Sequence, residues 1–213
     1  MSSTTSLRPL NPRAQAVQPQ RRAGERRYHS VLEEADKLLG EEGLTGFSIP
    51  VLAERLGYTR RSIYKFFPSP YAILNELTKT YLDRLEAYLV NHAELQSKDL
   101  HWEEVVTRLN TEGAKFHNAN PVSRLLILGG AVTDESFRAT EYSIKKLGGI
   151  LNDLLNERGI QVPTEPDVAS LAVDIATSVF RVSNLYHGYI DDQYGRESGR
   201  AMVAYLNLYV TPS

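Results

Sequence analysis

The chain has 213 residues, of which 42% are hydrophobic and 23% are charged. This balance is typical of a globular protein, and the length allows a small domain joined to a larger one. Cysteine is absent, which excludes disulfides and thiolate metal sites and favours a cytoplasmic location. The longest strongly apolar run covers about residues 125–132, far short of the ~20 residues that a membrane span needs, so no membrane partner is expected.

Charge is unevenly distributed along the chain. Residues 1–70 hold 11 basic and 7 acidic residues, whereas the remainder holds 13 basic and 19 acidic residues. The first third therefore carries a balance of +4 and the rest −6, within a net charge of −2. A basic N-terminal region on an acidic body predicts an anionic partner at the N-terminal end only.

Residues 1–20 are rich in Ser, Thr, Pro and Gln, carry Arg8 and Arg13, and precede the first acidic residue, Glu25. They lack the continuous apolar stretch of a secretory signal. Their composition predicts a flexible basic arm over residues 1–24. The sharper hypothesis for this arm is that its cations track the phosphates of a nucleic acid.

Helical periodicity begins after this arm. Gly43 closes the first predicted helix, and Ser48 caps a short second helix that has Pro50 in its first turn and ends at Gly57. The first helix has an apolar stripe with spacings of i, i+3, i+4, i+7, i+10 and i+11: Tyr28, Val31, Leu32, Ala35, Leu38 and Leu39.

A third short helix is capped by Thr59, and Ser69 followed by Pro70 opens a longer fourth helix that runs to about Asn91. Two short helices joined by a glycine-containing turn are the pattern of a helix-turn-helix motif. The apolar side chains expected to pack against the first helix are Ala53, Leu56, Ile63 and Phe67. The side chains then left outside are Arg60, Arg61, Tyr64 and Lys65.

Exposed cations on the third helix have a physical use in this motif, because the N-terminal part of its second helix enters the major groove of DNA. Arg can form a bidentate pair with the edge of guanine, whereas Lys and Tyr can hold phosphates. The free amides at the start of the helix add a favourable site for a phosphate.

Five further helices follow in the rest of the chain. Thr164 with Asp167 resembles a capping box, with an acid at N3 in place of Glu. No internal repeat is present, and the sequence predicts an all-α fold of about nine helices. The later helices are expected near residues 102–118, 121–128, 134–158, 164–188 and 196–210.

The stretch "GFSIPVLAERLGYTRRSIYKFFPSPYAILNEL" resembles the N-terminal signature of TetR-type transcriptional regulators. The resemblance covers about residues 25–75, and the rest of the chain matches only in helix number and length. The positions that match are Gly57, Thr59, Ile63, Tyr64, Phe67, Ser69 and Leu74.

The resemblance implies a homodimer with a helix-turn-helix DNA-binding domain at residues 25–70 and a ligand-binding and dimerisation domain at residues 71–213. Many members place Lys where this chain has Pro70, so one phosphate contact is lost here, for which Lys65 or the N-terminal arginines compensate. Packing of Tyr64 against the fourth helix is the alternative to its role in DNA binding. The implied DNA-facing set is Arg27, Ser48, Thr59, Arg60, Arg61, Tyr64 and Lys65.

The resemblance also implies that the last two helices pair with their twins in a four-helix dimer interface. The alternative is that the apolar stripes of these two helices pack within the core of the same chain. One stripe consists of Leu171, Ile175, Val179, Val182, Leu185 and Tyr189, and the other of Ala201, Ala204, Tyr205, Leu208 and Tyr209.

A small-molecule pocket is expected among the fourth to eighth helices, lined by aromatic or polar residues on apolar stretches. A buried His is more often a core residue that is hydrogen-bonded within the protein than a ligand contact. Arg181, if buried, needs a partner for its charge, which Asp174, the other subunit or a ligand could supply. Apolar helix surface favours a mostly hydrophobic ligand. A lactone or acyl-type effector is one hypothesis, although no particular residue supports it. The candidate lining residues are Trp102, Phe116, His117, Arg124, Tyr142, Arg181 and Asn184.

The expected function is a sequence-specific DNA-binding regulator, by family default a repressor, that a small effector releases from a palindromic operator through the fourth helix. An enzyme is the first alternative, but "HWEE" at residues 101–104 and "TDES" at residues 133–136 lack a nucleophile elbow or zincin spacing. A protein-binding helical adaptor is the second, although it needs no exposed Arg-Arg pair. No catalytic residue, cofactor or metal is expected.

Overall fold

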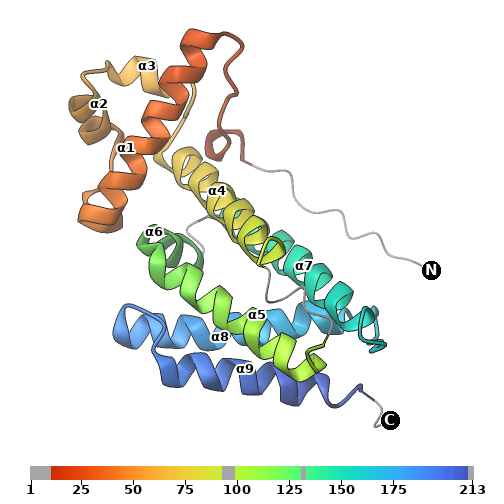
Figure 1. The fold of residues 1–213 in the computed structure, drawn as a ribbon. Coiled ribbons are helices and arrows are strands. Elements are labelled where there is room, and N and C mark those ends of the chain that lie inside the picture. The colour runs from red at the N-terminus through yellow and green to blue at the C-terminus, as the bar shows by residue number, and fades with distance from the viewer. Residues whose placement is uncertain (1–10, 93–98, 131–132, 211–213) are drawn as a thin grey trace. The chain divides into compact units, whose positions relative to one another are not determined.

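The computed structural model describes residues 11–92, 99–130 and 133–210, and Figure 1 shows that these ranges are helical and contain no strand. An isolated bridge joins Thr164 and Asp167. The predicted all-α class is therefore confirmed. The elements are η1 (Pro12–Ala14), α1 (Arg22–Gly46), α2 (Ile49–Leu56), α3 (Arg60–Tyr64), α4 (Pro70–Val90), α5 (Trp102–Ala119), α6 (Pro121–Ser123), η3 (Arg124–Leu128), α7 (Asp134–Asn156), α8 (Val168–His187) and α9 (Asp192–Leu206).

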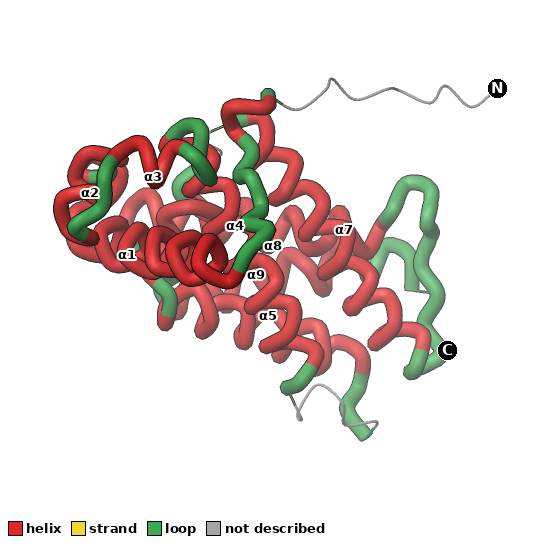
Figure 2. Tube along the Cα trace, turned by 90° about the horizontal axis from the view of Figure 1, so that it is seen from above, coloured by secondary structure: helices red, strands yellow, loops and turns green. Residues whose placement is uncertain are grey.

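The chain divides into two compact units. The N-terminal unit consists of Met1–Leu77 and Val132–Phe137, and the C-terminal unit consists of Thr78–Ala131 and Arg138–Ser213. Both α4 and α7 therefore contribute residues to each unit. Loops form the connections between the described helices, as Figure 2 shows.

Most of the predicted helix boundaries in the first part of the N-terminal unit are present in the structure. Gly43 has a φ of 65° and kinks α1, but the helix continues to Gly46 instead of closing at Gly43 as predicted. Ser48 accepts a hydrogen bond from the amide of Val51 at 3.4 Å at the start of α2. Gly57 then ends α2 in the left-handed conformation, with φ 64° and ψ 28°, which glycine adopts at little cost.

The third helix is shorter than predicted, at five residues. Its cap is as expected, because Thr59 accepts a hydrogen bond from the amide of Ser62 at 3.3 Å. The buried side chains Ile63 and Phe67 anchor this segment. The ring of Phe67 stacks on Tyr28 of α1 with 4.7 Å between centroids, so the apolar stripe of α1 holds the helix-turn-helix in place.

Two helix starts in the C-terminal unit differ from the predictions. Asp167, rather than Thr164, caps α8, because its carboxylate accepts from the amide of Ser170 at 3.0 Å. Asp191 caps α9 by accepting from the amide of Gln193 at 2.8 Å, and α9 therefore starts before residue 196. In both cases the aspartate nearest the helix satisfies a free N-terminal amide.

The core of the C-terminal unit lies where α5 and α8 pack on α9. One face of α8 is buried there, including Ala172, Ala176 and Phe180. By length and composition α8 could cross a membrane, as could no other helix in the described part, and 44% of its most apolar window is buried in the fold. The predicted helix at residues 121–128 is split into α6 and the π-helical η3, whose Gly129 amide donates to the carbonyl of Arg124 at 2.8 Å.

Candidate functional site

The exposed face of α3 carries the cations that the sequence predicts. Arg60, Arg61 and Lys65 are exposed, and Tyr64 is 45% exposed. None of the three cations forms an ion pair with a carboxylate of the described residues. Their charges are therefore available to an external anion, and the open face of Tyr64 argues against complete burial under α4.

A basic hollow beside α3 brings together two cations predicted separately and one that was not predicted. Arg21 and Arg27 of the α1 region and Lys65 after α3 line this hollow with segment 17–20, and it contains no described acidic residue. The guanidinium of Arg27 also lies 5.3 Å from the ring centroid of Tyr58. A hollow with three cations and no acid is suited to a phosphate group.

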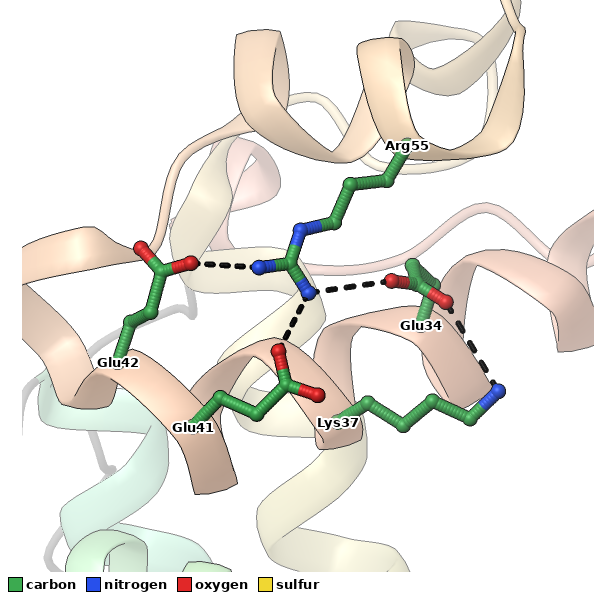
Figure 3. Close-up of polar contacts among 5 residues, drawn as sticks. All are labelled: Glu34, Lys37, Glu41, Glu42 and Arg55. Atoms are coloured by element: carbon green, nitrogen blue, oxygen red, sulfur yellow. Dashed lines mark hydrogen bonds and ion pairs between the residues drawn. The ribbon is translucent and has the colours of Figure 1, made fainter.

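Arg55 shows that not every cation of the N-terminal unit is free. Its guanidinium pairs with three carboxylates of α1, drawn in Figure 3: Glu41 at 2.7 Å, Glu42 at 2.5 Å and Glu34 at 3.4 Å. Lys37 lies 3.9 Å from Glu34 in the same cluster. These ion pairs connect α2 to α1. The cluster has more acidic than basic residues, although residues 1–70 as a whole are basic.

An N-terminal strap, residues 11–21, takes the place of part of the predicted flexible arm. The amide of Val17 donates to the carbonyl of Phe66 at 2.7 Å, directly after the recognition helix. The amide of Asn75 donates to the carbonyl of Ala14 at 2.8 Å, and the hydroxyl of Ser69 donates to the carbonyl of Arg13. The strap thus supports the turn between α3 and α4; residues 1–10, with Arg8, lie outside the described residues.

A partly buried polar network connects the strap to the core of the N-terminal unit. The side-chain amide of Gln18 donates to the Tyr28 hydroxyl at 3.1 Å, and this hydroxyl donates to Glu76 at 2.8 Å. Burial, reinforced by the hydrogen bond to Glu76, raises the pKa of Tyr28 well above its ordinary value. The phenol therefore stays protonated and keeps its donor at physiological pH.

The first turn of α7 belongs to the same unit. The Thr133 hydroxyl donates to the amide oxygen of Asn75 at 3.0 Å, and the backbone amide of Asn11 donates to Glu135 at 2.6 Å. Asn75 therefore joins the strap, α4 and the start of α7. Sequence patterns gave no signal for this junction, because its members are more than 50 residues apart.

The C-terminal unit contains an apolar cavity among α4, α5, α7, α8 and α9. Its volume is about 50 Å³, several times the ~10–15 Å³ needed to hold one water molecule. No charged residue lines it. The lining consists of Leu85, Leu89, Leu109, Asn110, Gly113, His117, Leu147, Val173, Ala176, Thr177, Phe180 and Met202.

His117 alone of the seven predicted ligand residues lines this cavity. It is 4% exposed, and its Nδ1 lies 2.9 Å from Oγ of Ser123. Burial, with a smaller contribution from nearby Arg124, lowers the pKa of His117 to about 4. The imidazole is therefore neutral at physiological pH.

The other six predicted ligand residues lie elsewhere, and they do not converge on the cavity. Arg124 is a structural bridge, because its guanidinium donates to the carbonyls of His117, Asn118 and Gly188 at 2.8–3.1 Å. Tyr142 is 63% exposed and lies over the ammonium of Lys146. Trp102 and Phe116 are buried outside the cavity lining, and Arg181 and Asn184 are half-buried. Aromatic or polar character on an apolar helix therefore did not identify the lining.

The two motifs weighed as catalytic are parts of helix starts. Glu104 accepts from the amide of His101 at 3.2 Å at the start of α5. Thr133 accepts from the amide of Ser136 at 3.0 Å at the start of α7. Within the described ranges, no cluster of His, Cys, Asp or Glu could hold a metal ion.

Apolar side chains along α8 and just after α9 remain exposed in the chain, and they are called the uncovered apolar face. Leu185 is 78% exposed, Tyr186 is 70% exposed and Leu208, after α9, is 76% exposed. Leu171 and Val182 on α8 and Tyr189 just after it are also exposed. Four of these residues, Leu171, Val182, Leu185 and Tyr189, belong to one predicted stripe, whereas the buried face of α8 is a different one.

Comparison with known families identifies the N-terminal region. Residues 31–77 match the family model described as "Bacterial regulatory proteins, tetR family". The chain carries the N-terminal domain of the TetR family. The predicted resemblance is confirmed, and the matched segment contains α2, α3, the exposed cations and Asn75. A DNA-binding regulator is the function that this match supports.

Solved TetR-type structures share the fold of the chain. A TetR-family transcriptional regulator from Streptomyces coelicolor is 18% identical, with a TM-score of 0.60, over 86% of this chain and 99% of that one. A transcriptional regulator from Cytophaga hutchinsonii is 12% identical, with a TM-score of 0.63, over 87% and 99%. The multidrug binding protein EbrR, solved with imidazole, is 15% identical, with a TM-score of 0.64, over 88% and 97%. Among curated proteins, none matches the sequence.

Proposed function

We propose that the protein is a cytoplasmic homodimeric repressor that binds a pseudo-palindromic operator and is released from it by a small, mostly hydrophobic effector. The observation that carries this proposal is the exposed face of α3, where Arg60 and Arg61 have no ion-pair partner among the described residues. These cations lie within the family-matched segment. A helix-turn-helix places such side chains against base edges in the major groove.

Within this proposal, α3 and the basic hollow have different roles. Arg60 and Arg61 read bases, whereas Arg27 and Lys65 hold phosphates together with Arg21. Tyr64 and the capping residues Ser48 and Thr59 complete the DNA-facing set. The hollow supplies the phosphate contact that Pro70 cannot make.

Dimerisation through α8 and α9 explains the uncovered apolar face. Exposed apolar side chains along a helix pair, with Leu185, Tyr186 and Leu208 more than two-thirds exposed, are costly in water and are typical of an interface. A two-fold axis would pair the face with itself and place two copies of α3 on successive half-sites. Leu185→Glu is expected to yield a monomer in analytical ultracentrifugation, while Leu44→Glu, a change of another exposed leucine, keeps the dimer.

Release from DNA would use the cavity of the C-terminal unit as the effector site. Its apolar lining supports a hydrophobic ligand, of which a lactone or acyl compound is one example. α4 is the proposed lever, and α7 is a second connection because its first turn belongs to the N-terminal unit. The effector must prefer the released state by ~1.4 kcal/mol for each tenfold loss of DNA affinity.

The experiment that tests this function is selection of bound fragments from the source genome, followed by footprinting. A protected pseudo-palindrome with half-sites about one helical turn apart supports the proposal. Recovery of fragments without a shared sequence contradicts a sequence-specific regulator. Capture of a protein partner by a chain that binds no DNA would instead favour the helical adaptor.

A further inference from the structure

His117 presents a polar atom to the apolar cavity that the fold leaves without a partner. Its Nδ1 is engaged by Ser123, and no described residue forms a hydrogen bond with its Nε2. No fully enclosed side-chain nitrogen or oxygen lacks a partner among the described residues. Nε2 therefore contacts open space, and the space that His117 lines is the cavity.

Ser123 determines which ring nitrogen carries the proton. Its side chain is completely buried, and its hydroxyl has one described hydrogen-bond partner, Nδ1 of His117. A buried hydroxyl proton requires an acceptor, so the hydroxyl donates and Nδ1 accepts. A neutral imidazole that accepts at Nδ1 carries its proton at Nε2. The cavity is thus offered a hydrogen-bond donor.

The other polar side chains of the lining already have partners within the protein. The amide group of Asn110 donates to the carbonyl of Gly195 at 2.9 Å, and its oxygen accepts from Ser198 at 2.6 Å. The Thr177 hydroxyl donates to the carbonyl of Val173 at 2.9 Å. All remaining lining residues are apolar or glycine. Among the polar side chains of the described lining, His117 is therefore the one whose donor nitrogen has no partner in the protein, whereas the amide nitrogen of Asn110 already uses one of its two hydrogens.

We propose that this cavity binds a small, uncharged, apolar molecule whose single hydrogen-bond acceptor, such as a carbonyl oxygen, accepts from Nε2–H of His117. This inference rests on the proposed function, because it names the chemical class of the effector. The lining offers no charge to balance an ionic ligand, which disfavours one. A hydrocarbon of the same shape would fill the cavity but leave the buried donor unpaired.

The tautomer can be measured on the full chain without any ligand. Nitrogen NMR of protein labelled in its imidazole rings is expected to show His117 neutral and protonated at Nε2. The Ser123→Ala variant removes the donor to Nδ1, and its spectrum should lose this fixed preference. A wild-type ring protonated at Nδ1, or at both nitrogens at neutral pH, overturns the inference.

A matched pair of probes tests recognition. Cyclohexanone and methylenecyclohexane have nearly the same shape, but the ketone alone has a strong acceptor. The ketone is expected to bind wild-type protein about fivefold more tightly, the ratio that corresponds to a net hydrogen bond of ~1 kcal/mol. In His117→Phe the ratio should fall to about one. Equal wild-type affinities, or no binding of either probe, overturn the inference.

DNA titrations separate this inference from the proposed function. If the ketone preference depends on His117 but cyclohexanone does not change operator affinity, the recognition chemistry stands and the effector role of the cavity is contradicted. If operator binding is sequence-specific but the ketone preference is absent, the regulator stands and the inference about His117 is overturned. The wild-type comparison and the tautomer do not depend on whether His117→Phe folds.

Discussion

Helix α3 and the helices of the C-terminal unit around Lys115 and Lys146 differ in how their cations are paired. On α3, Arg60 and Arg61 have no ionic partner among the described residues. In the C-terminal unit, Lys146 pairs with Glu86 and Lys115 pairs with Glu112, each at 2.7 Å. A free cation can bind a phosphate without breaking an existing pair. The proposed DNA-binding role of α3 therefore depends on the availability of its cations rather than on their number.

The same contrast extends to buried polar groups. In the N-terminal unit the side-chain amide of Asn75 is bonded at both its nitrogen and its oxygen, to Ala14 and Thr133 respectively. In the C-terminal unit His117 uses one ring nitrogen and leaves the other facing a cavity. Complete pairing is typical of a scaffold, whereas an unpaired group in an apolar cavity is typical of a binding site. Four predictions test this contrast, from the largest expected effect to the smallest.

Acidification should destabilise the C-terminal unit through His117. Its pKa is about 4 in the fold and ~6.5 in the unfolded chain. Since the unfolded state binds the proton first, stability contributed above pH 6.5 is lost as the pH falls toward 4, by roughly 2–3 kcal/mol. Denaturant unfolding of wild type and His117→Phe at pH 7 and pH 4.5 measures the difference. Identical pH dependence in both proteins would show that His117 is not buried in its neutral form.

Removal of a free cation should cost more DNA affinity than removal of a paired one. Arg61→Ala is expected to weaken operator binding by ~1–3 kcal/mol and to relax discrimination at one base pair. Arg200 of α9 pairs with Glu197 at 2.6 Å, so Arg200→Ala is the matched control with unchanged binding. Fluorescence anisotropy with operator and single-base variants provides the measurement. Equal losses in both variants would point to a general charge effect.

Loss of the shared amide should loosen the N-terminal unit. Asn75→Ala removes the side-chain donor to the Ala14 carbonyl and the acceptor of the Thr133 hydroxyl, at an expected cost of ~1–3 kcal/mol. Asn91→Ala is the control, because that amide bonds only to the carbonyl of Ala87 in its own helix, and its expected effect is within ~0.5 kcal/mol. Hydrogen exchange of the Val17 amide reports on the strap directly. Unchanged exchange in Asn75→Ala would separate the strap from α4.

Two helical glycines of the C-terminal unit should respond in opposite directions to alanine. At Gly113 a methyl group would enter the cavity 3.8 Å from Phe180, so Gly113→Ala should stabilise the fold by ~1 kcal/mol through helix propensity and weaken cyclohexanone binding. At Gly148 it would lie 2.7 Å from the Cα of Ser170, so Gly148→Ala should destabilise by ~1–3 kcal/mol. Thermal unfolding of both variants checks the signs. Destabilisation by Gly113→Ala would mean that the cavity has no room there.

Local features were predictable from the sequence, and tertiary ones were not. The caps at Ser48 and Thr59 and the turn at Gly57 depend on residues within one turn of each other, so their spacing carries the information. The partners of Arg55 and Asn75 depend on how distant segments meet. The spacing of residues along the sequence does not predict these tertiary contacts.

The cavity lining illustrates the same limit. A search for aromatic and polar residues found His117 but also selected Arg124, which the fold uses to hold backbone carbonyls. Half of the lining residues are Leu, Val or Ala, residue types that also form ordinary core. The cavity arises from the way in which five helices pack together, and the residue pattern of any one helix does not predict it.

The most direct test of the central claim is a titration of the protein with its own upstream DNA and with a scrambled duplex, at several salt concentrations. The free cations of α3 predict tight binding to the native fragment, lost discrimination in Arg61→Ala, and a uniform loss with a shallower salt dependence in Lys65→Ala. Equal and steeply salt-dependent binding to both duplexes, unaffected in its selectivity by Arg61→Ala, would contradict the claim that α3 reads sequence.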